Sequence, residues 1–223
     1  MAVLSGLVIL GGLKRIGAFA AKFVPLMALF YMGAGILVLW KNAGAIPGAL
    51  ALILRCAFHP EAVAGGAAGY TVRQAIHYGV ARGIFTNEAG LGSAPIAHAG
   101  AAAKGPVEQG CWGIFEVFVD TILMCGFTAV IILSEGDLWR SGLDGAALTA
   151  AVFSRALGPA GGWVVSVSIL LFAFSSVLGW GYYGERGIGW LTGDDPRIIG
   201  AYRFCYLLVM ILAAPARLGL IWG

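Results

Sequence analysis

Charged residues are scarce in this sequence. Asp, Glu, Lys and Arg make up 11% of its 223 residues, against 60% hydrophobic residues and a mean hydropathy of +0.88, whereas a soluble domain carries about 25% charged residues. The scarcity excludes an ordinary soluble enzyme or binding domain, and a net charge of +3 gives no indication of a nucleic-acid partner. We therefore predict an all-α, polytopic helix bundle in a lipid bilayer, with residues 1–223 in one membrane domain.

Paired spacings of metal-binding or disulfide-forming residues are also lacking. The cysteines are isolated and the histidines are scattered: Cys56, Cys111, Cys125 and Cys205, and His59, His77 and His98. Ser93 and His98 lack the Gly-x-Ser-x-Gly setting of a hydrolase, because Leu91 occupies the first glycine position. These absences predict that the protein is not an enzyme and uses no organic cofactor.

Long uncharged windows divide the chain into helices. Four of them predict membrane spans: Phe23 to Leu39, Ala89 to Ala103 with a polar lead-in, Thr121 to Ser134, and Ala156 to Gly184. Because crossing about 30 Å of hydrocarbon takes roughly 20 helical residues, the second and third windows must recruit flanking charged residues. A further helix is predicted at each of Met1 to Leu13, Pro47 to Phe58 (interfacial or re-entrant), Ala146 to Ala156 (amphipathic) and Arg197 to Leu212, with a flexible approach at Gly65 to Gly69 and Pro215 after the last helix.

Loop charges predict an orientation for these spans. Alternation places Lys14 to Lys22, Lys104 and Glu185 to Arg203 inside the cell, and Lys41 to Tyr70 and Glu135 to Leu157 outside. Val107 to Leu133 and Gly161 to Tyr183 are predicted as single helices between these loops.

A polar, glycine-rich stretch from Arg82 to Pro95 interrupts the apolar pattern. Exposed backbone groups cannot face lipid without losing several kcal/mol each, so we expect a helix over Tyr70 to Phe85, a break near Thr86 to Gly92, and a second helix over Ser93 to Ala103. Two opposed helix ends then face one small volume. That arrangement suits a zwitterion, with a carboxylate on freed N–H groups and Na⁺ on freed carbonyls and side-chain oxygens.

The break therefore supplies the candidate substrate site. Its predicted substrate-binding residues are Phe85, Thr86, Asn87, Gly90, Gly92 and Ser93, and Asn87 is also a candidate Na⁺ ligand. Glu88 is expected to tie the loop together. The alternative is a buried kink that packs against its neighbours and binds no ligand.

Two further polar clusters lie in predicted spans. Ser175 and Ser176 could coordinate Na⁺ through their hydroxyls, because hard cations prefer oxygen ligands, or they could simply bond back to helix carbonyls. Glu116 and Asp120 are four residues apart in one predicted helix, for which a structural hydrogen-bonding role is favoured over ion coupling.

The run Arg82 to Pro95 resembles the signature of the alanine/glycine:cation symporter family, the sodium:alanine symporters. Other stretches agree in the same order: Gly11 to Ile16, Val24 to Met27, Gly65 to Thr71, Phe118 to Thr121, and Phe172 to Glu185. The resemblance implies a leucine-transporter-type fold of two inverted five-helix repeats, of which this chain covers roughly the fifth to ninth helices. It also implies that Ser175 and Ser176 occupy a shared sodium site, and that Trp180 walls the substrate cavity and limits it to small side chains.

Family members are about twice this length, so the chain resembles an internal fragment of a larger transporter. The implied function is Na⁺-coupled symport of a small neutral amino acid, alanine or glycine, by alternating access in the plasma (bacterial inner) membrane. The implied partners are the amino acid, the coupling ion Na⁺, the lipid bilayer and the missing N-terminal helical half. Two alternatives stay open: a non-transporting remnant or subunit that needs the missing helices, and a proton-coupled carrier of the same fold.

Overall fold

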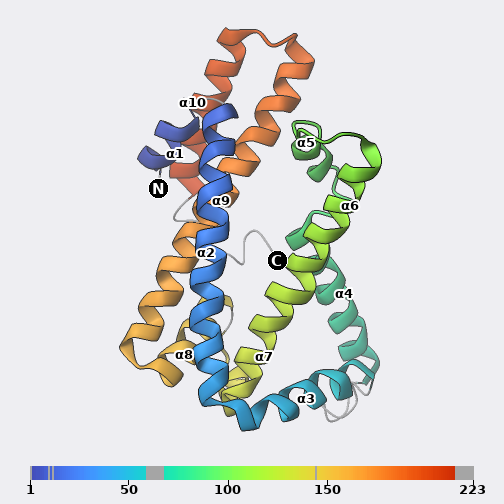
Figure 1. Cartoon of the computed structure of the whole chain (residues 1–223), viewed down its shortest axis with the longest axis vertical. Coiled ribbons are helices and arrows are strands. Elements are labelled where there is room, and N and C mark those ends of the chain that lie inside the picture. The colour runs from blue at the N-terminus through green and yellow to red at the C-terminus, as the bar shows by residue number, and fades with distance from the viewer. Residues whose placement is uncertain (1, 10, 12, 59–67, 144, 214–223) are drawn as a thin grey trace. The chain divides into compact units, whose positions relative to one another are not determined.

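The computed structural model describes residues 2–9, 11, 13–58, 68–143 and 145–213 (Figure 1). Throughout these residues the regular elements are helices and there is no strand, which confirms the all-α prediction. The part of the Gly65 to Gly69 approach before Ala68 and the predicted feature at Pro215 lie outside the described residues.

Ten α-helices are described, together with three shorter or wider helical turns. The α-helices are α1 (Ala2–Ile9), α2 (Leu13–Lys41), α3 (Ile46–Phe58), α4 (Ala68–Asn87), α5 (Ala94–His98), α6 (Pro106–Val117), α7 (Gly126–Ser134), α8 (Gly145–Leu157), α9 (Pro159–Thr192) and α10 (Pro196–Ala213). A π-helical segment, Phe118–Cys125, joins α6 to α7, and 3-10 turns occupy Ala43–Ala45 and Gly136–Arg140.

Four stretches of the described chain are long and apolar enough to cross a bilayer: Arg15–Lys41, Pro106–Ser134, Pro159–Thr192 and Pro196–Ala213. Two of the predicted windows, Phe23 to Leu39 and Thr121 to Ser134, fall inside these stretches, and a third, Ala156 to Gly184, overlaps Pro159–Thr192. The span predicted over Ala89 to Ala103 is in none of them. The predicted helix over Val107 to Leu133 is continuous through its π-helical part. The short helices predicted near Pro47 and Ala146 are confirmed as α3 and α8. The protein is therefore an integral membrane protein with several spans.

Several predicted boundaries are wrong. The loop expected over Lys14 to Lys22 is helical, because α2 begins at Leu13, and the helix expected over Met1 to Leu13 is described as α1 only as far as Ile9. The helix expected over Ser93 to Ala103 is only α5, Ala94–His98, because the chain turns after His98 through bonds from Gly100 N to Ala97 O and from Ala101 N to His98 O. The loop expected over Glu185 to Arg203 is mostly helical, since α9 continues to Thr192 and α10 begins at Pro196.

The chain divides into two compact units, Met1–Ala28 with Ser168–Gly223, and Leu29–Val167. The core of the first unit joins Ile9 and Ile16 to Phe174 and Leu178 on α9. Phe19 packs edge-on against Phe174 with ring centroids 5.2 Å apart. This apolar contact fixes the start of α2 against α9.

Within the first unit, long polar side chains of α10 bond to α9. The hydroxyl of Tyr202 donates to the Gly181 carbonyl at 3.3 Å, and that of Tyr206 donates to the Val177 carbonyl at 2.7 Å. A Cβ on Gly184 would collide with the Tyr202 hydroxyl, so a larger residue there would displace this tyrosine. Gly184 thus leaves room for a tyrosine of α10 to reach the backbone of α9.

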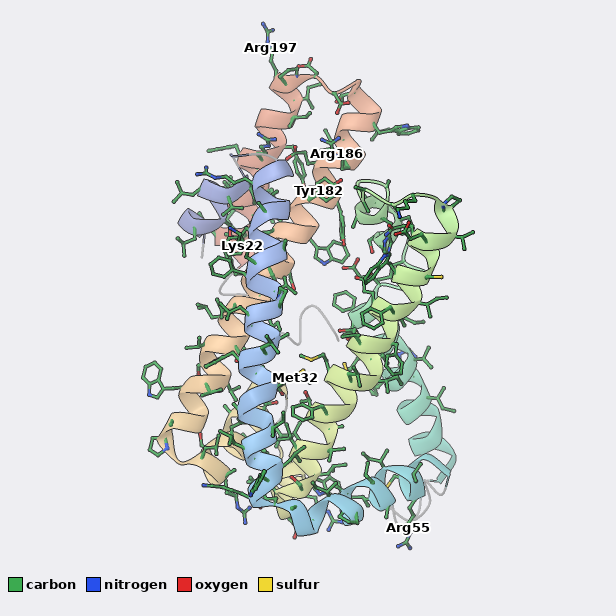
Figure 2. All side chains as sticks on the ribbon, viewed as in Figure 1. Lys22, Met32, Arg55, Tyr182, Arg186 and Arg197 are labelled. Atoms are coloured by element: carbon green, nitrogen blue, oxygen red, sulfur yellow. The ribbon has the colours of Figure 1, made fainter. Side chains whose placement is uncertain are left out.

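A buried ion pair adds to these contacts. The Arg203 guanidinium donates to both carboxylate oxygens of Glu185, at 2.7 and 2.8 Å, and the two side chains are 21% and 5% exposed. Arg186, labelled in Figure 2, instead holds its guanidinium carbon 5.8 Å from the centre of the Tyr182 ring. The Glu185–Arg203 pair explains why α9 extends past the predicted boundary: the charge that ends the apolar window is neutralised by its partner.

In the second unit, α2, α7 and α8 share a core of buried residues that includes Val38, Ile131, Val152 and Phe153. The Tyr31 ring stacks on Phe153 at 5.7 Å, and its hydroxyl is 2.9 Å from the Thr128 hydroxyl. Polar contacts close one end of this core.

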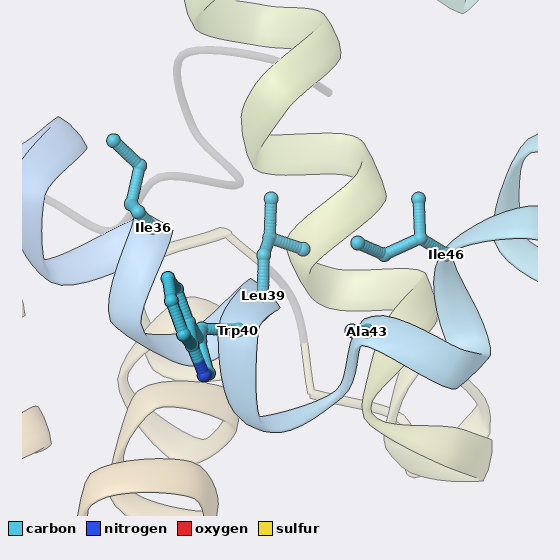
Figure 3. A pocket seen from close by; sticks show the side chains of 5 residues that line it. All are labelled: Ile36, Leu39, Trp40, Ala43 and Ile46. Atoms are coloured by element: carbon cyan, nitrogen blue, oxygen red, sulfur yellow. The ribbon is translucent and has the colours of Figure 1, made fainter.

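At that end, Glu135 accepts a hydrogen bond from the Asn42 amide and pairs with Arg155 at 3.7 Å, while Lys41 donates to the Ala156 carbonyl at 2.9 Å. These contacts join the loops that alternation places on one face of the membrane. A shallow apolar hollow lies at the bend from α2 to α3 (Figure 3). It is lined by Ile36, Leu39, Trp40, Ala43 and Ile46.

Candidate functional site

The interruption between α4 and α5 comprises residues 88–93. Three of these residues have left-handed backbone angles: Glu88 with φ of 56°, Gly90 with 85° and Gly92 with 83°. Glycine adopts this region without a Cβ penalty, whereas Glu88 does so under strain. The predicted break is therefore confirmed, with Thr86 and Asn87 forming the last turn of α4.

Side chains within the break hold its shape. The Asn87 Oδ1 accepts a hydrogen bond from the Ala89 amide at 2.9 Å, and the Glu88 carbonyl accepts one from the Leu91 amide at 3.1 Å. The Ser93 hydroxyl donates to the Glu88 carboxylate at 2.8 Å. The predicted role of Glu88 as a tie within the loop is thus confirmed.

Asn87 also connects the break to the next long helix. Its Nδ2 donates to the Thr121 hydroxyl at 3.0 Å, across 34 residues of sequence. Thr121 belongs to the π-helical segment Phe118–Cys125, and such widened turns frequently occur at functional sites. Asn87 therefore joins the end of α4 to the π-helical segment.

Asp120, next to Thr121, does not behave as expected. Its Oδ2 is buried and has no hydrogen-bond partner in the part of the chain that the structure describes, so the structural hydrogen bond predicted for this carboxylate is not found for that oxygen. Glu116 pairs instead with the His98 imidazole at 3.4 Å. The two acids therefore have different surroundings although they are four residues apart.

The remaining predicted residues differ in how firmly they are held. Thr86 donates its hydroxyl back to the Arg82 carbonyl at 2.9 Å, a local helix bond. Phe85 is exposed, whereas Ser93 is buried and makes no side-chain cap on α5. Because α5 has only five residues, its dipole is weak, and the expected carboxylate would rest on loop amides more than on a helix end.

The second predicted cluster lies on α9 in the first unit. Ser175 donates back to the Phe172 carbonyl at 2.9 Å, which is the ordinary behaviour of a membrane-helix serine. Ser176 is exposed, and the Trp180 ring packs edge-on against Tyr183 at 5.8 Å. The structure brings Asn87, Glu88 and Ser93 together in the second unit and describes Ser175, Ser176 and Trp180 separately in the first.

The break offers oxygen atoms of the kind that Na⁺ prefers. In the described residues no group of three or more His, Cys, Asp or Glu side chains could hold a metal ion, so a cation here would rely on amide, hydroxyl and carbonyl oxygens such as those of Asn87 and Thr121. Sequence reasoning missed Thr121 as a partner of Asn87. The signal available was its position directly after Asp120 in the predicted span.

Gly92 gives a direct test of the backbone requirement. A Cβ there would meet open space among the described residues, but φ is +83°. We expect Gly92→Val to destabilise the protein by about 1–2 kcal/mol, and Gly92→Asn by less because asparagine tolerates this region. Thermal unfolding of the purified protein in detergent measures the difference, and equal unfolding temperatures for the two variants would contradict the left-handed turn.

Comparison with known proteins gives the family. Residues 1–223 match the model of the sodium:alanine symporter family. The chain is 43% identical over 221 residues to an uncharacterized transporter of Haemophilus influenzae, covering 99% of this chain and 48% of the relative. It is 42% identical over 226 residues to the sodium/alanine symporter AgcS of Methanococcus maripaludis, covering 100% of this chain and 48% of the relative.

A third relative, the probable sodium/glutamine symporter GlnT of Bacillus subtilis, is 41% identical over 217 residues, with coverage of 97% of this chain and 44% of the relative. The chain thus spans about half the length of the curated relatives it matches. Because the family model matches every residue of this membrane protein, the chain belongs to the sodium:alanine symporter family.

Proposed function

We propose that this chain forms part of a carrier that moves a small neutral amino acid, alanine or glycine, into the cell together with Na⁺. The observation that carries the proposal is the interruption at residues 88–93, whose left-handed turns bend the backbone at the end of α4. Non-helical backbone at membrane depth persists where it is buried in protein or lines a cavity, and interrupted helices are a recurring location of substrate and ion sites in secondary transporters.

The proposed substrate site uses Phe85, Thr86, Asn87, Gly90, Gly92 and Ser93. The glycines let the backbone approach a small ligand closely, and loop amides would receive its carboxylate. Asn87 is the proposed link between this site and the cation, because its amide oxygen and the neighbouring Thr121 hydroxyl are hard ligands. Ser175 and Ser176 are the proposed ligands of Na⁺ on α9, with Trp180 as a wall that favours small side chains.

The fold of the whole carrier is proposed to be of the leucine-transporter type. In that scheme the fifth helix is α2, the broken sixth is α4 with α5, the seventh runs from α6 to α7, the eighth is α9 and the ninth is α10. Alternating access arises when helices rock around the bound solute. The segment that completes the relatives' length would supply the other inverted repeat. The plasma membrane is the proposed location.

The names of two relatives support this proposal and leave the substrate open. One is a sodium/alanine symporter and another a probable sodium/glutamine symporter. We favour alanine or glycine because the implied position of Trp180 would restrict side-chain size.

Uptake by the chain joined to the missing half of a full-length relative tests the proposal. We expect ¹⁴C-alanine to accumulate in proteoliposomes under an inward Na⁺ gradient, with competition by glycine and weaker competition by glutamine. Replacing Na⁺ with choline at fixed pH should abolish accumulation, and persistence of uptake would favour the proton-coupled alternative. Absence of amino-acid uptake by the joined protein would overturn the carrier proposal.

The alternative function is that of a subunit that transports only together with further helices. The same assay with the 223-residue chain alone separates the two functions. Uptake only in the joined protein identifies the chain as a part that needs its missing helices.

A further inference from the structure

His98, the last residue of α5, lies between the interrupted helix and α6. Its Nδ1 is in hydrogen-bond contact with the Gln109 side-chain amide nitrogen, and its Nε2 lies 3.4 Å from a carboxylate oxygen of Glu116. Both ring nitrogens therefore face side chains of α6. The ring thus spans the two helices through polar contacts at each end.

The sequence of α6 presents these partners on one side of the helix. Gln109, Gly113 and Glu116 are separated by four and three residues, the spacing of a single helix face. A Cβ on Gly113 would lie 3.6 Å from the His98 Nε2, so the ring passes closely over the backbone at that position. The His98 ring thus contacts Gln109 and Glu116 through its two nitrogens and lies close to the backbone at Gly113.

The hydrogen-bond roles define two states of this contact. When the Gln109 amide donates to Nδ1, the neutral ring carries its proton on Nε2 and directs it toward Glu116. A second proton on Nδ1 makes the ring an imidazolium, which pairs with the Glu116 carboxylate as a charge-assisted contact, while Gln109 turns its oxygen toward the ring. Both states are compatible with the same side chains.

Among the described residues, Glu116 is the charged residue that pairs with the His98 ring. Four other charged residues of the surrounding elements have their own contacts or lie a turn away. Glu108 accepts from the Lys104 backbone amide, and Glu88 accepts from Ser93. Arg82 lies over the Tyr78 ring, and Asp120 is one turn beyond Glu116. The pairing between His98 and Glu116 is therefore the contact that responds to ring protonation.

We propose that His98 is a positioning residue that couples α5 to α6, and that protonation of its ring tightens this coupling and slows transport. The inference rests on the proposed carrier function, because α5 is the short half of the interrupted helix. A firmer attachment to α6 restricts the movement of α5 that alternating access requires. The effect falls on the maximal rate, since His98 is not among the proposed substrate ligands.

The transport arm of the test uses the joined carrier at pH 5.5 to 8. Wild-type maximal uptake should fall about two- to fivefold on acidification, as expected for one partly exposed ion pair, while KM for alanine stays constant. His98→Gln, which remains neutral, should lose this acid dependence. His77→Gln is the matched control, because His77 is an exposed histidine on α4, and should keep the wild-type profile.

A second arm does not depend on transport. Spin labels on Ala97→Cys and the native Cys111, both exposed, with the other cysteines replaced by serine, report the distance from α5 to α6. The distance distribution should narrow on acidification with His98 present and stay unchanged in His98→Gln. A wild-type response of either readout in His98→Gln would overturn the proposal; a normal distance response without any uptake would instead reject the carrier function.

Discussion

Replacing Asn87 with leucine should reduce sodium-dependent alanine uptake by the joined carrier at least about tenfold, the equivalent of losing two hydrogen bonds. Leucine cannot accept from the Ala89 amide or donate to the Thr121 hydroxyl, so the first turn of the break and its connection to the π-helical segment are lost together. Initial uptake rates in proteoliposomes, normalised to inserted protein, measure the effect.

Thr121→Val separates the two roles of Asn87. It removes the acceptor of the Asn87 Nδ2 and leaves the bond to Ala89 intact. If Asn87 acts only through Thr121, both single variants and the double variant should lose uptake equally; a larger loss in Asn87→Leu assigns the remainder to the break itself. Wild-type uptake by inserted Asn87→Leu would show that the substrate site lies elsewhere.

Replacing Arg203 with alanine should destabilise the protein by about 3–5 kcal/mol, because it leaves a buried carboxylate without its partner. The Glu185 side chain is 5% exposed and receives both of its strong hydrogen bonds from Arg203. Thermal unfolding in detergent should therefore begin at a clearly lower temperature in Arg203→Ala.

Arg197→Ala is the matched control for charge removal. Arg197 is an exposed residue near the start of α10, and Figure 2 shows its side chain extending away from the helices. Its replacement should change stability by less than about 0.5 kcal/mol. The double variant Glu185→Leu with Arg203→Leu should recover much of the lost stability, since it leaves no unpaired buried charge. If it unfolds at a temperature as low as that of Arg203→Ala, the loss in Arg203→Ala comes from missing side-chain packing and not from an unpaired carboxylate.

The sequence predicted the features that depend on local pattern. The break was expected from the glycines and polar residues between Arg82 and Pro95, and it occurs where Glu88, Gly90 and Gly92 turn the backbone. The short helices α3 and α8 were likewise recognisable, because apolar residues gather between turn-forming neighbours.

Features that depend on distant residues were not predictable in this way. Glu185 ended an apolar window in the sequence, yet α9 continues through it because Arg203, 18 residues later, neutralises the charge. Thr121 is 34 residues from Asn87, and no spacing rule joins them. The length of α5 was overestimated because the alanines after His98 favour a helix, while the turn at Gly100 and the contacts of His98 to α6 end it.

The π-helical segment has a consequence for sequence alignment within the family. Its hydrogen bonds span one more residue than those of the flanking α-helices, so the helical phase before Phe118 differs from the phase after Cys125. A single heptad or helical wheel drawn across Pro106–Ser134 assigns residues to incorrect faces on one side of the segment. A relative with one residue fewer in this segment would present a rotated helix surface on one side of it, so the position of an alignment gap here decides which residues are matched in space.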